Sequence, residues 1–276
     1  MTIEHDVAGH YAHGGLEQAI LEALVGQGKD PDRLDPADLA PVDEFHIGGR
    51  QATADLAAQL ALAPGRHLLD IGSGIGGAAR YFALAHDCRV TGIDLTEEYV
   101  AVARSLARRT GLGGKVRFQQ GSALDLPFPD ASFDGAYMLH VGMNIADKPA
   151  LFAGVRRVLR PGGFLAVYDV MRVGEGALDF PVPWASRPET SFVAAAPAYR
   201  AALRAAGFAV TAERDRRDFA IAFFGAMKAR QAETGPPPLG LPILMGPDFR
   251  QKTANMIGNL ERGLIAPTEM IARLDG

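Results

Sequence analysis

Residues 68–77 read LLDIGSGIGG, and this stretch determines how the rest of the chain is interpreted. The apolar run 67–71 predicts a short buried strand, and the glycines after it predict a tight turn where a ligand can approach backbone N–H groups closely. Residues 78–85 then have a helical pattern. A strand, a glycine-rich turn and a helix in this order indicate the first unit of a parallel α/β sheet.

Strand-like and helix-like segments continue to alternate after this unit, which is typical of a doubly wound α/β fold. Turn and capping residues separate them: Asp147 precedes an apolar helical face, and Pro161-Gly162-Gly163 predicts the turn into the next strand. Further strands are expected at 89–94, 115–119, 133–139, 164–170 and 208–213, and a short last strand at 270–274.

Helices are also expected outside this alternation, near both ends of the sequence. One amphipathic helix ends at Gly26, and a second ends before Pro64-Gly65. Near the C-terminus two helices, at 215–231 and 248–264, interrupt the strand–helix rhythm. We therefore expect helical additions around the sheet.

The composition is that of an ordinary globular protein, with 48% hydrophobic and 22% charged residues. The formal net charge of −4 gives no overall positive charge that would attract a polyanion. Neither nucleic acid nor a stable membrane association is therefore expected. Cys88 is the single cysteine, which excludes an intrachain disulfide and a cysteine-based metal site. No apolar run is long enough to span a membrane, and we expect a cytoplasmic protein without a metal.

The glycine turn fits two kinds of ligand. Gly72, Gly74 and Gly77 satisfy the G-x-G-x-x-G pattern of dinucleotide sites, so an NAD-dependent oxidoreductase is one interpretation. Asp70 favours another, because a carboxylate at this place repels a pyrophosphate and attracts the ammonium and sulfonium groups of S-adenosylmethionine. Two unit charges about 4 Å apart interact by roughly 4 kcal/mol at an effective dielectric constant near 20. An alternative role for Asp70, a cap for the following helix, is compatible with this one.

Asp94 ends the second expected strand, where an acidic side chain can accept hydrogen bonds from both hydroxyls of an adenosine ribose. This role suits either ligand. The alternative is that Asp94 caps the helix that starts near Thr96.

A series of motifs in order along the chain resembles that of class I S-adenosylmethionine-dependent methyltransferases. The resemblance is greatest to the methyltransferase type 11 branch, which includes ubiquinone/menaquinone C-methyltransferases and sarcosine/dimethylglycine N-methyltransferases. It implies a seven-stranded, mostly parallel sheet in the order 3-2-1-4-5-7-6 with strand 7 antiparallel, and residues 217–263 inserted between the last two strands. The motifs are 68–76, Thr91-Gly92-Ile93-Asp94, Gln120-Gly121-Ser122-Ala123, Leu126-Pro127-Phe128, Phe133-Asp134 and Leu159-Arg160-Pro161-Gly162-Gly163.

The resemblance also implies one domain, 1–276. Residues 1–63 would form a helical cap, 64–172 the cofactor-binding core, and 173–276 a substrate cover, the insertion and the last strands. An aromatic residue ahead of the first helix, at Tyr11, and a loop containing His46 would close over the cofactor. The expected cofactor-binding residues are Tyr11, His46, Asp70, Gly72, Ser73, Gly74, Gly76, Asp94, Leu95, Gly121, Ser122, Ala123, Leu139 and His140.

One of these positions departs from the family pattern. The acidic residue that accepts a hydrogen bond from the adenine amine falls at Ser122. A serine oxygen accepts that bond more weakly than a carboxylate, so the adenine contact could rest on the Ala123 backbone.

Methyl transfer is an in-line displacement in which alignment and desolvation of the nucleophile supply much of the catalysis, and a base is needed only if the nucleophile loses a proton. His140, after the fourth expected strand, is the candidate catalytic base; the alternatives are a contact to the cofactor or a role in ordering its loop. Met143, Asn144, Trp184 and Phe223 are expected to contact the acceptor, against the alternative that they only pack or cap.

The sequence therefore predicts a methyltransferase that moves a methyl group from S-adenosylmethionine to an N, O, C or S nucleophile of a small molecule. A catalytically inactive methyltransferase-like binding subunit is the second hypothesis, compatible with Ser122 but not with the intact glycine loop. An oxidoreductase conflicts with Asp70 and leaves 159–163 unexplained. Apolar additions near both ends also suggest a homodimer.

Overall fold

A twisted seven-stranded sheet forms the centre of the computed structural model, which describes residues 2–12, 14–235 and 237–275. The strand order is β3-β2-β1-β4-β5-β7-β6, and every pairing is parallel except those of β7. The predicted fold class is therefore confirmed. The strands are β1 His67–Ile71, β2 Arg89–Asp94, β3 Val116–Gln120, β4 Phe133–Leu139, β5 Leu159–Arg172, β6 Phe208–Asp215 and β7 Ile265–Leu274.

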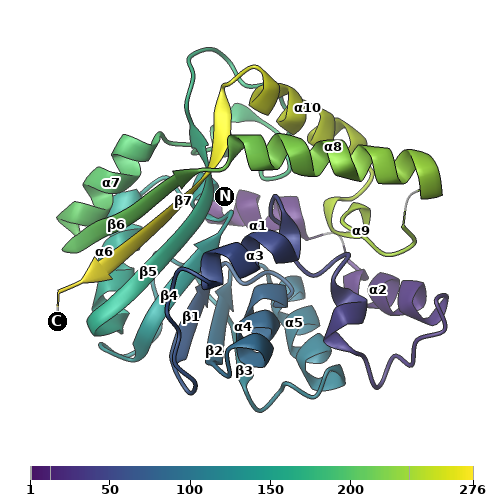
Figure 1. Ribbon diagram of the computed structural model, residues 1–276, viewed down its shortest axis with the longest axis horizontal. Helices are drawn as coiled ribbons and strands as arrows, with labels where there is room; N and C mark the ends of the chain where they lie inside the picture. Colours follow the sequence, from purple (N-terminus) through teal and green to yellow (C-terminus); the bar gives the residue numbers. More distant parts are fainter. Residues whose placement is uncertain (1, 13, 236, 276) are drawn as a thin grey trace.

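Helices cover both faces of the sheet and one of its ends (Figure 1). Helices α3, α4 and α5 pack on one face and α6 and α7 on the other, while α8 and α10 cross the end where the parallel strands terminate (Figure 1). The helices are α1 Ile3–Tyr11, α2 Leu16–Val25, α3 Gly49–Ala57, α4 Gly77–Ala85, α5 Glu97–Arg109, α6 Lys148–Val158, α7 Ala196–Ala205, α8 Arg217–Thr234, α9 Pro242–Met245 and α10 Phe249–Glu261, with 3-10 turns η1 Pro36–Leu39, η2 Gly142–Asn144 and η3 Pro188–Thr190.

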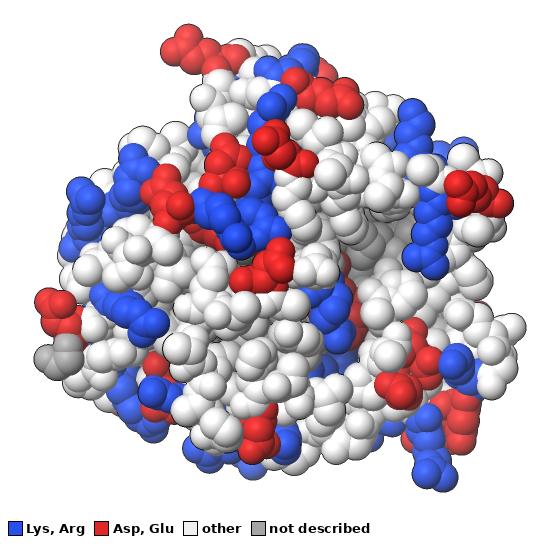
Figure 2. All heavy atoms as spheres, viewed as in Figure 1, with Lys and Arg blue, Asp and Glu red and all other residues white. Residues whose placement is uncertain are grey.

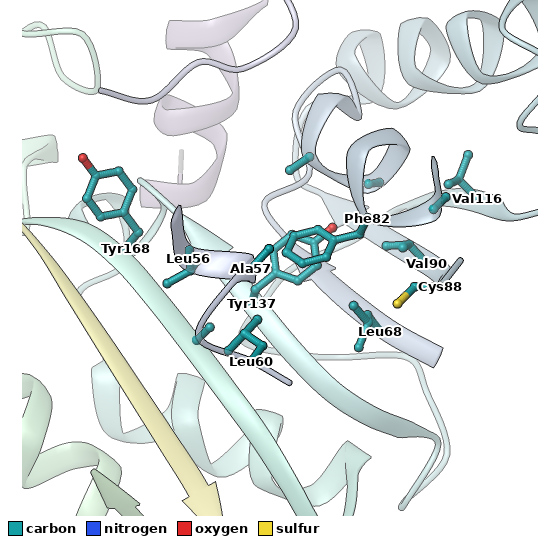
Figure 3. Packing of buried hydrophobic residues seen from close by; sticks show 14 of the residues in the cluster. Leu56, Ala57, Leu60, Leu68, Phe82, Cys88, Val90, Val116, Tyr137 and Tyr168 are labelled. Atoms are coloured by element: carbon teal, nitrogen blue, oxygen red, sulfur yellow. The ribbon is translucent and has the colours of Figure 1, made fainter. Parts of the chain in front are cut away.

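Successive residues of each central strand supply the two cores, because side chains alternate between the faces of a sheet. Leu68 packs in the core under α3 and α4, whereas Leu69 packs under α6 and α7. The first core centres on Phe82 of α4, whose ring stacks on Tyr137 of β4 at a centroid distance of 4.5 Å (Figure 3). This packing holds the glycine turn between β1 and α4 in place.

Several elements differ from the sequence-based expectation, and α1, β5 and β7 differ most. Helix α1 was not expected, because Val7 is its one buried residue among those described and it has little apolar periodicity. Strand β7 is longer than the expected 270–274, and β5 extends through the expected Pro161-Gly162-Gly163 turn. Strand β7 gains its length from pairing with β5 between Phe164 and Arg172, whereas the start of β5 is fixed by the pairing of Leu159 with Phe133 of β4; local sequence encodes neither pairing.

The described part of the chain contains no helix that is both long and apolar enough to cross a bilayer. Residues 217–263 lie between β6 and β7, as expected, and they carry α8, α9 and α10 to the carboxyl ends of the parallel strands.

Candidate active site

A large cavity lies at the carboxyl ends of the parallel strands, the place where α/β sheets bind ligands. Its volume is about 1530 Å³. The glycine turn and the ends of β2 and β4 form its floor, α1 and residues 40–51 form one side, and α8 to α10 form the roof. Figure 2 shows the surface hollowed below α8 and beside α9, with mostly uncharged atoms at the rim. We call this space the central cavity.

The glycine turn presents backbone to the central cavity. Gly72 and Gly74 have φ angles of +69° and +52°, which side chains of L-residues rarely adopt. A Cβ atom on Gly74 would meet no protein atom within 4 Å, so this residue borders open space. A Cβ atom on Gly72 would instead lie 2.4 Å from Val141 Cγ2. The absence of a side chain at Gly74 therefore leaves space for a ligand, whereas at Gly72 it allows close packing against Val141.

Asp70 is the last but one residue of β1, and it is buried beside the turn. Its Oδ2 atom has no hydrogen-bond partner among the described residues. Burial raises the pKa of its carboxyl group to about 8, although the neighbouring Tyr137 phenol opposes the shift. A buried carboxylate without a partner is costly, and a cation placed against it would remove that cost.

Asp94 at the end of β2 is held by two backbone N–H groups. Its Oδ2 accepts from Gly74 N at 2.8 Å and its Oδ1 from Thr96 N at 2.8 Å. Thr96 occupies the N-cap position of α5 but makes no side-chain cap. Asp94 thus links the glycine turn to α5, and it still lines the central cavity with free lone pairs.

Helix α1 closes the side of the cavity through two polar contacts. Asn144 Nδ2 donates to the Tyr11 hydroxyl at 2.9 Å, which joins α1 to η2. The Ser122 hydroxyl donates to Glu4 Oε1 and accepts from Leu124 N at 3.0 Å. Tyr11 is the last residue of α1 and not a residue ahead of the first helix, which corrects the expectation.

His140 follows β4 in a strained conformation. Its φ angle is +56°, and its backbone N–H donates to Tyr168 O at 2.6 Å. Strain of this kind at a non-glycine residue is held by the surrounding structure and occurs often at functional sites. Its Nε2 atom is buried with no partner among the described residues, and burial together with the adjacent His46 puts its pKa well below the usual histidine range.

His46 lies in the segment before α3 and faces His140 across a ring-centroid distance of 5.9 Å. Its Nε2 lies 3.1 Å from Gly49 O and 3.1 Å from Thr53 Oγ1. Thr53 in turn donates to Glu44, which also pairs with Arg50. Burial lowers the pKa of His46, and Glu44 opposes this.

The buried carboxyl group of Asp169 and the amine of Lys148 pack against the η2 turn. Asp169 of β5 accepts from the Tyr199 hydroxyl at 2.6 Å, and burial raises its pKa to about 6. Lys148 donates to Ile145 O at 2.6 Å. Since a Cβ atom on Gly142 would lie 2.2 Å from Asp169 Oδ2, the turn sits directly on this carboxyl group.

Aromatic and sulfur-containing side chains form the roof. Phe223, Phe224 and Met227 of α8 line the central cavity together with Trp184 and Met143. Trp184 is itself buried, and its Nε1 donates to Ser191 at 2.9 Å, so much of its surface packs in the core under the roof.

The structure brings most of the predicted site residues to one cavity. Gly76 and Ser122 are the two that do not line it: Gly76 packs against Phe118 and caps α4, and Ser122 is engaged with Glu4. Those that line the cavity are Tyr11, His46, Asp70, Gly72, Ser73, Gly74, Asp94, Leu95, Gly121, Ala123, Leu139, His140, Met143, Asn144, Trp184 and Phe223.

Several polar residues of the site were not predicted. Glu44 and Thr53 gave no periodic signal, and in sequence the acidic pair Asp43-Glu44 looks like an ordinary solvated part of a connecting loop. Asp169 interrupts an otherwise apolar strand, which is a signal that could have been used.

Residues 69–167 match the family model described as a methyltransferase domain. Among curated relatives, O-methyltransferase cnsE of Penicillium expansum is 36% identical over 166 residues, covering 60% of this chain and 53% of that protein. The 27-O-demethylrifamycin SV methyltransferase of Amycolatopsis mediterranei is 40% identical over 121 residues, covering 44% of each. The chain thus spans about half the length of the curated relatives it matches.

Solved structures share the fold over nearly the whole chain. Geranyl diphosphate C-methyltransferase from Streptomyces coelicolor, in complex with Mg²⁺, geranyl diphosphate and S-adenosylhomocysteine, aligns with a TM-score of 0.70 at 17% identity, covering 99% of this chain and 98% of that one. A sarcosine dimethylglycine methyltransferase from Galdieria sulphuraria aligns with a TM-score of 0.69 at 20% identity, covering 84% and 93%. With the sheet order, these matches show that residues 69–167 match a methyltransferase domain and that the chain has the fold of the class I methyltransferases.

Proposed function

We propose that this protein is an S-adenosylmethionine-dependent methyltransferase that acts on a hydroxyl group of a small, largely apolar molecule. The observation that carries the proposal is the buried, unpartnered Oδ2 of Asp70 beside the glycine turn. A cation placed there would stabilise the charged carboxylate, whereas a pyrophosphate would oppose its ionisation and gain no attraction.

The residues of the floor fit the methyl donor. Asp70 would hold its cationic methionine end, Asp94 its ribose hydroxyls, and Gly74 and Ala123 would border its remaining surface. S-adenosylmethionine supplies a methyl group on a positively charged sulfur, which is a good leaving group. The protein's contribution is then to align the acceptor and exclude water.

The choice of acceptor rests on the roof and on the relatives. A central cavity of about 1530 Å³ is larger than the 300–1,000 Å³ of a common ligand site, so it has room for an acceptor beside the donor. Its roof carries Phe223, Phe224 and Met227. Four of the relatives are named O-methyltransferases, which supports oxygen as the acceptor atom.

Deprotonation of a hydroxyl needs a group that accepts a proton at the cavity wall. The sequence predicts His140 for this role; its ring is neutral and lines the cavity, and the ring of His46 lines the cavity beside it. Met143 and Asn144, on the turn that follows, would contact the acceptor.

Two measurements test the proposal. Calorimetric titration should show binding of S-adenosylmethionine and of its demethylated product, and no binding of NAD. Transfer of a radiolabelled methyl group should then be measured over a panel of phenols, aliphatic alcohols and amines. Donor binding without transfer to any acceptor would favour the inactive binding subunit, and NAD binding would contradict the proposal.

The remaining expectations are part of the same proposal. Residues 1–63 act as a cap, 64–172 as the donor-binding core and 173–276 as the acceptor cover, in one domain. A homodimer is proposed, to be tested by sedimentation; nucleic acid is not expected as a partner. Within residues 2–12, 14–235 and 237–275, no group of three or more His, Cys, Asp or Glu side chains could hold a metal ion.

A further inference from the structure

Two histidine side chains, and not one, border the central cavity where an acceptor would lie. His46 and His140 face each other, and both rings contact Tyr168 of β5, at centroid distances of 5.9 Å and 4.9 Å. Their hydrogen-bond surroundings differ, and this difference distinguishes their chemistry.

The contacts of His46 determine which of its nitrogens carries the hydrogen. Gly49 O, 3.1 Å from Nε2, can only accept a hydrogen bond. The Thr53 hydroxyl donates its hydrogen bond to Glu44 Oε2. Its oxygen therefore acts as an acceptor toward His46 Nε2, 3.1 Å away. In the neutral ring the hydrogen must therefore lie on Nε2, and Nδ1 carries the lone pair.

His46 Nδ1 keeps a lone pair that no described residue uses. His46 lines the cavity, and no residue of the described chain is hydrogen-bonded to Nδ1. Nδ1 is also absent from the buried, unpartnered polar atoms, which include His140 Nε2. An acceptor in the cavity can reach His46 Nδ1.

Glu44 stabilises a positive charge on the His46 ring. Its Oε2 lies 3.5 Å from His46 Nε2, and the side chains of both residues are almost fully buried, so their attraction is weakly screened. Arg50 on α3 shares this carboxylate and reduces the effect. Among the described residues His140 has no such carboxylate partner: the rings of His46 and Tyr168 pack against it, and a proton on it would bury an unpaired charge.

We propose that His46 is the residue that accepts the proton of the acceptor hydroxyl, with Glu44 and Thr53 as its positioning residues. This inference rests on the proposed function. The acceptor oxygen forms a bond to the methyl carbon while the carbon–sulfur bond breaks and its electron pair stays on sulfur. The hydroxyl proton passes to His46 Nδ1 and then to water. His140 lies beside His46 in the same wall of the cavity and packs against the acceptor.

The first test needs no acceptor. Protein labelled with ¹⁵N-histidine and saturated with S-adenosylhomocysteine should show the His46 ring as the Nε2–H tautomer by NMR, with His46→Gln used for assignment. Glu44→Gln should lower the pH at which His46 titrates, because the carboxylate stabilises the charged ring. An Nδ1–H tautomer, or an unchanged titration in Glu44→Gln, would overturn the inference.

The second test is the rate of methyl transfer to 1-naphthol as a function of pH. The rate should fall as the pH drops through the His46 pKa, since the charged ring accepts no proton. His46→Gln should lower kcat about 100-fold or more and abolish this fall. Glu44→Gln should move the fall to lower pH, Thr53→Val should lower the rate, and Thr53→Ser should restore it.

His140→Asn is the matched comparison. It should retain the acidic fall in rate with a smaller loss of kcat. If His140→Asn abolishes the pH dependence while His46→Gln keeps it, the roles are reversed and the inference fails. Failure of the wild-type protein to bind S-adenosylmethionine or to transfer methyl groups would instead count against the proposed function, whatever the NMR result.

Discussion

Asp70, the proposed contact to the cationic end of the methyl donor, makes the stability of the protein depend on pH. The folded, donor-free protein keeps a proton on this carboxyl up to a pKa of about 8, whereas the unfolded chain releases it in the ordinary aspartate range. The unfolded state therefore binds fewer protons between these values, and the free energy of unfolding falls as pH rises through that window. The site has a cost in stability that the bound cation removes.

Asp70→Asn should separate these two effects. The neutral amide lacks the buried titration, so the donor-free variant should lose less stability than the wild type between pH 5 and pH 8, as measured by thermal unfolding. Its affinity for S-adenosylmethionine should fall by about ten- to a hundredfold, as expected when a charged contact of 1.5–3 kcal/mol is lost. At pH 7, calorimetry in buffers of different ionisation enthalpy should show proton release on binding to the wild type and none for the variant. Unchanged affinity would contradict the assignment.

Gly74 and Gly72 offer a matched pair of substitutions. Both have positive φ, so alanine costs about 1–2 kcal/mol of backbone strain at either position. Only at Gly72 would the new methyl also collide with Val141. Gly74→Ala should therefore fold with a modestly lower Tm but lose donor binding, whereas Gly72→Ala should lose much more of its thermal stability. A Gly74→Ala protein with wild-type affinity would show that the donor does not approach this turn.

At the residue scale, the sequence predicted those site residues whose position follows from a recognisable local pattern. Asp70 and Asp94 were placed at strand ends by the β–α alternation alone, and both line the central cavity. The Glu44–Thr53 pair was not found, because its members approach through a loop-to-helix contact that no periodicity encodes.

At the scale of elements, α1 is held over the cavity by the contact between Tyr11 and Asn144. The Tyr11 ring also packs edge-on against Phe45 at a centroid distance of 6.1 Å and against Tyr99 at 5.9 Å. Tyr11→Phe keeps these ring contacts and removes only the hydroxyl. The variant thus isolates the polar link between α1 and η2.

A double-mutant cycle should measure that link. Tyr11→Phe and Asn144→Ala should each weaken donor binding several-fold, and the double variant should be no weaker than the worse single one. The coupling expected for one hydrogen bond is about 0.5–1.5 kcal/mol. Calorimetry should measure the affinity of the wild type, the two single variants and the double variant. Additive effects would show that the two residues act independently.

Helices and strands whose own residues form a clear pattern were predicted well, and those that depend on distant contacts were not. The buried parallel strands β1, β2 and β4 appear as apolar runs and were found with their exact bounds. Helix α1 was missed because its contacts with η2 and with Ser122 lie far away in the sequence. Strand β7 was found only in part, since its length depends on β5 and β6 on either side.

At the scale of the whole molecule, the central cavity lies between the sheet and an inserted helical cover. The floor comes from β1, β2 and β4, which belong to the matched region 69–167. The roof comes from α8 to α10, between β6 and β7, outside that region. A floor that binds the donor and a roof that selects the acceptor could change separately, and one pair of phenylalanines on α8 can test this.

Phe223 and Phe219 lie one helical turn apart on α8 with their rings stacked at a centroid distance of 6.5 Å, but only Phe223 lines the cavity. Phe219 lies close to Gly48, and the Arg216 guanidinium sits 4.0 Å from its ring centroid. Phe223→Ala should therefore raise the KM for 1-naphthol about tenfold, from the loss of apolar burial, and leave the affinity for S-adenosylmethionine unchanged. Phe219→Ala should lower the Tm and leave KM nearly unchanged. If Phe223→Ala weakens donor binding instead, the roof and floor are not separate.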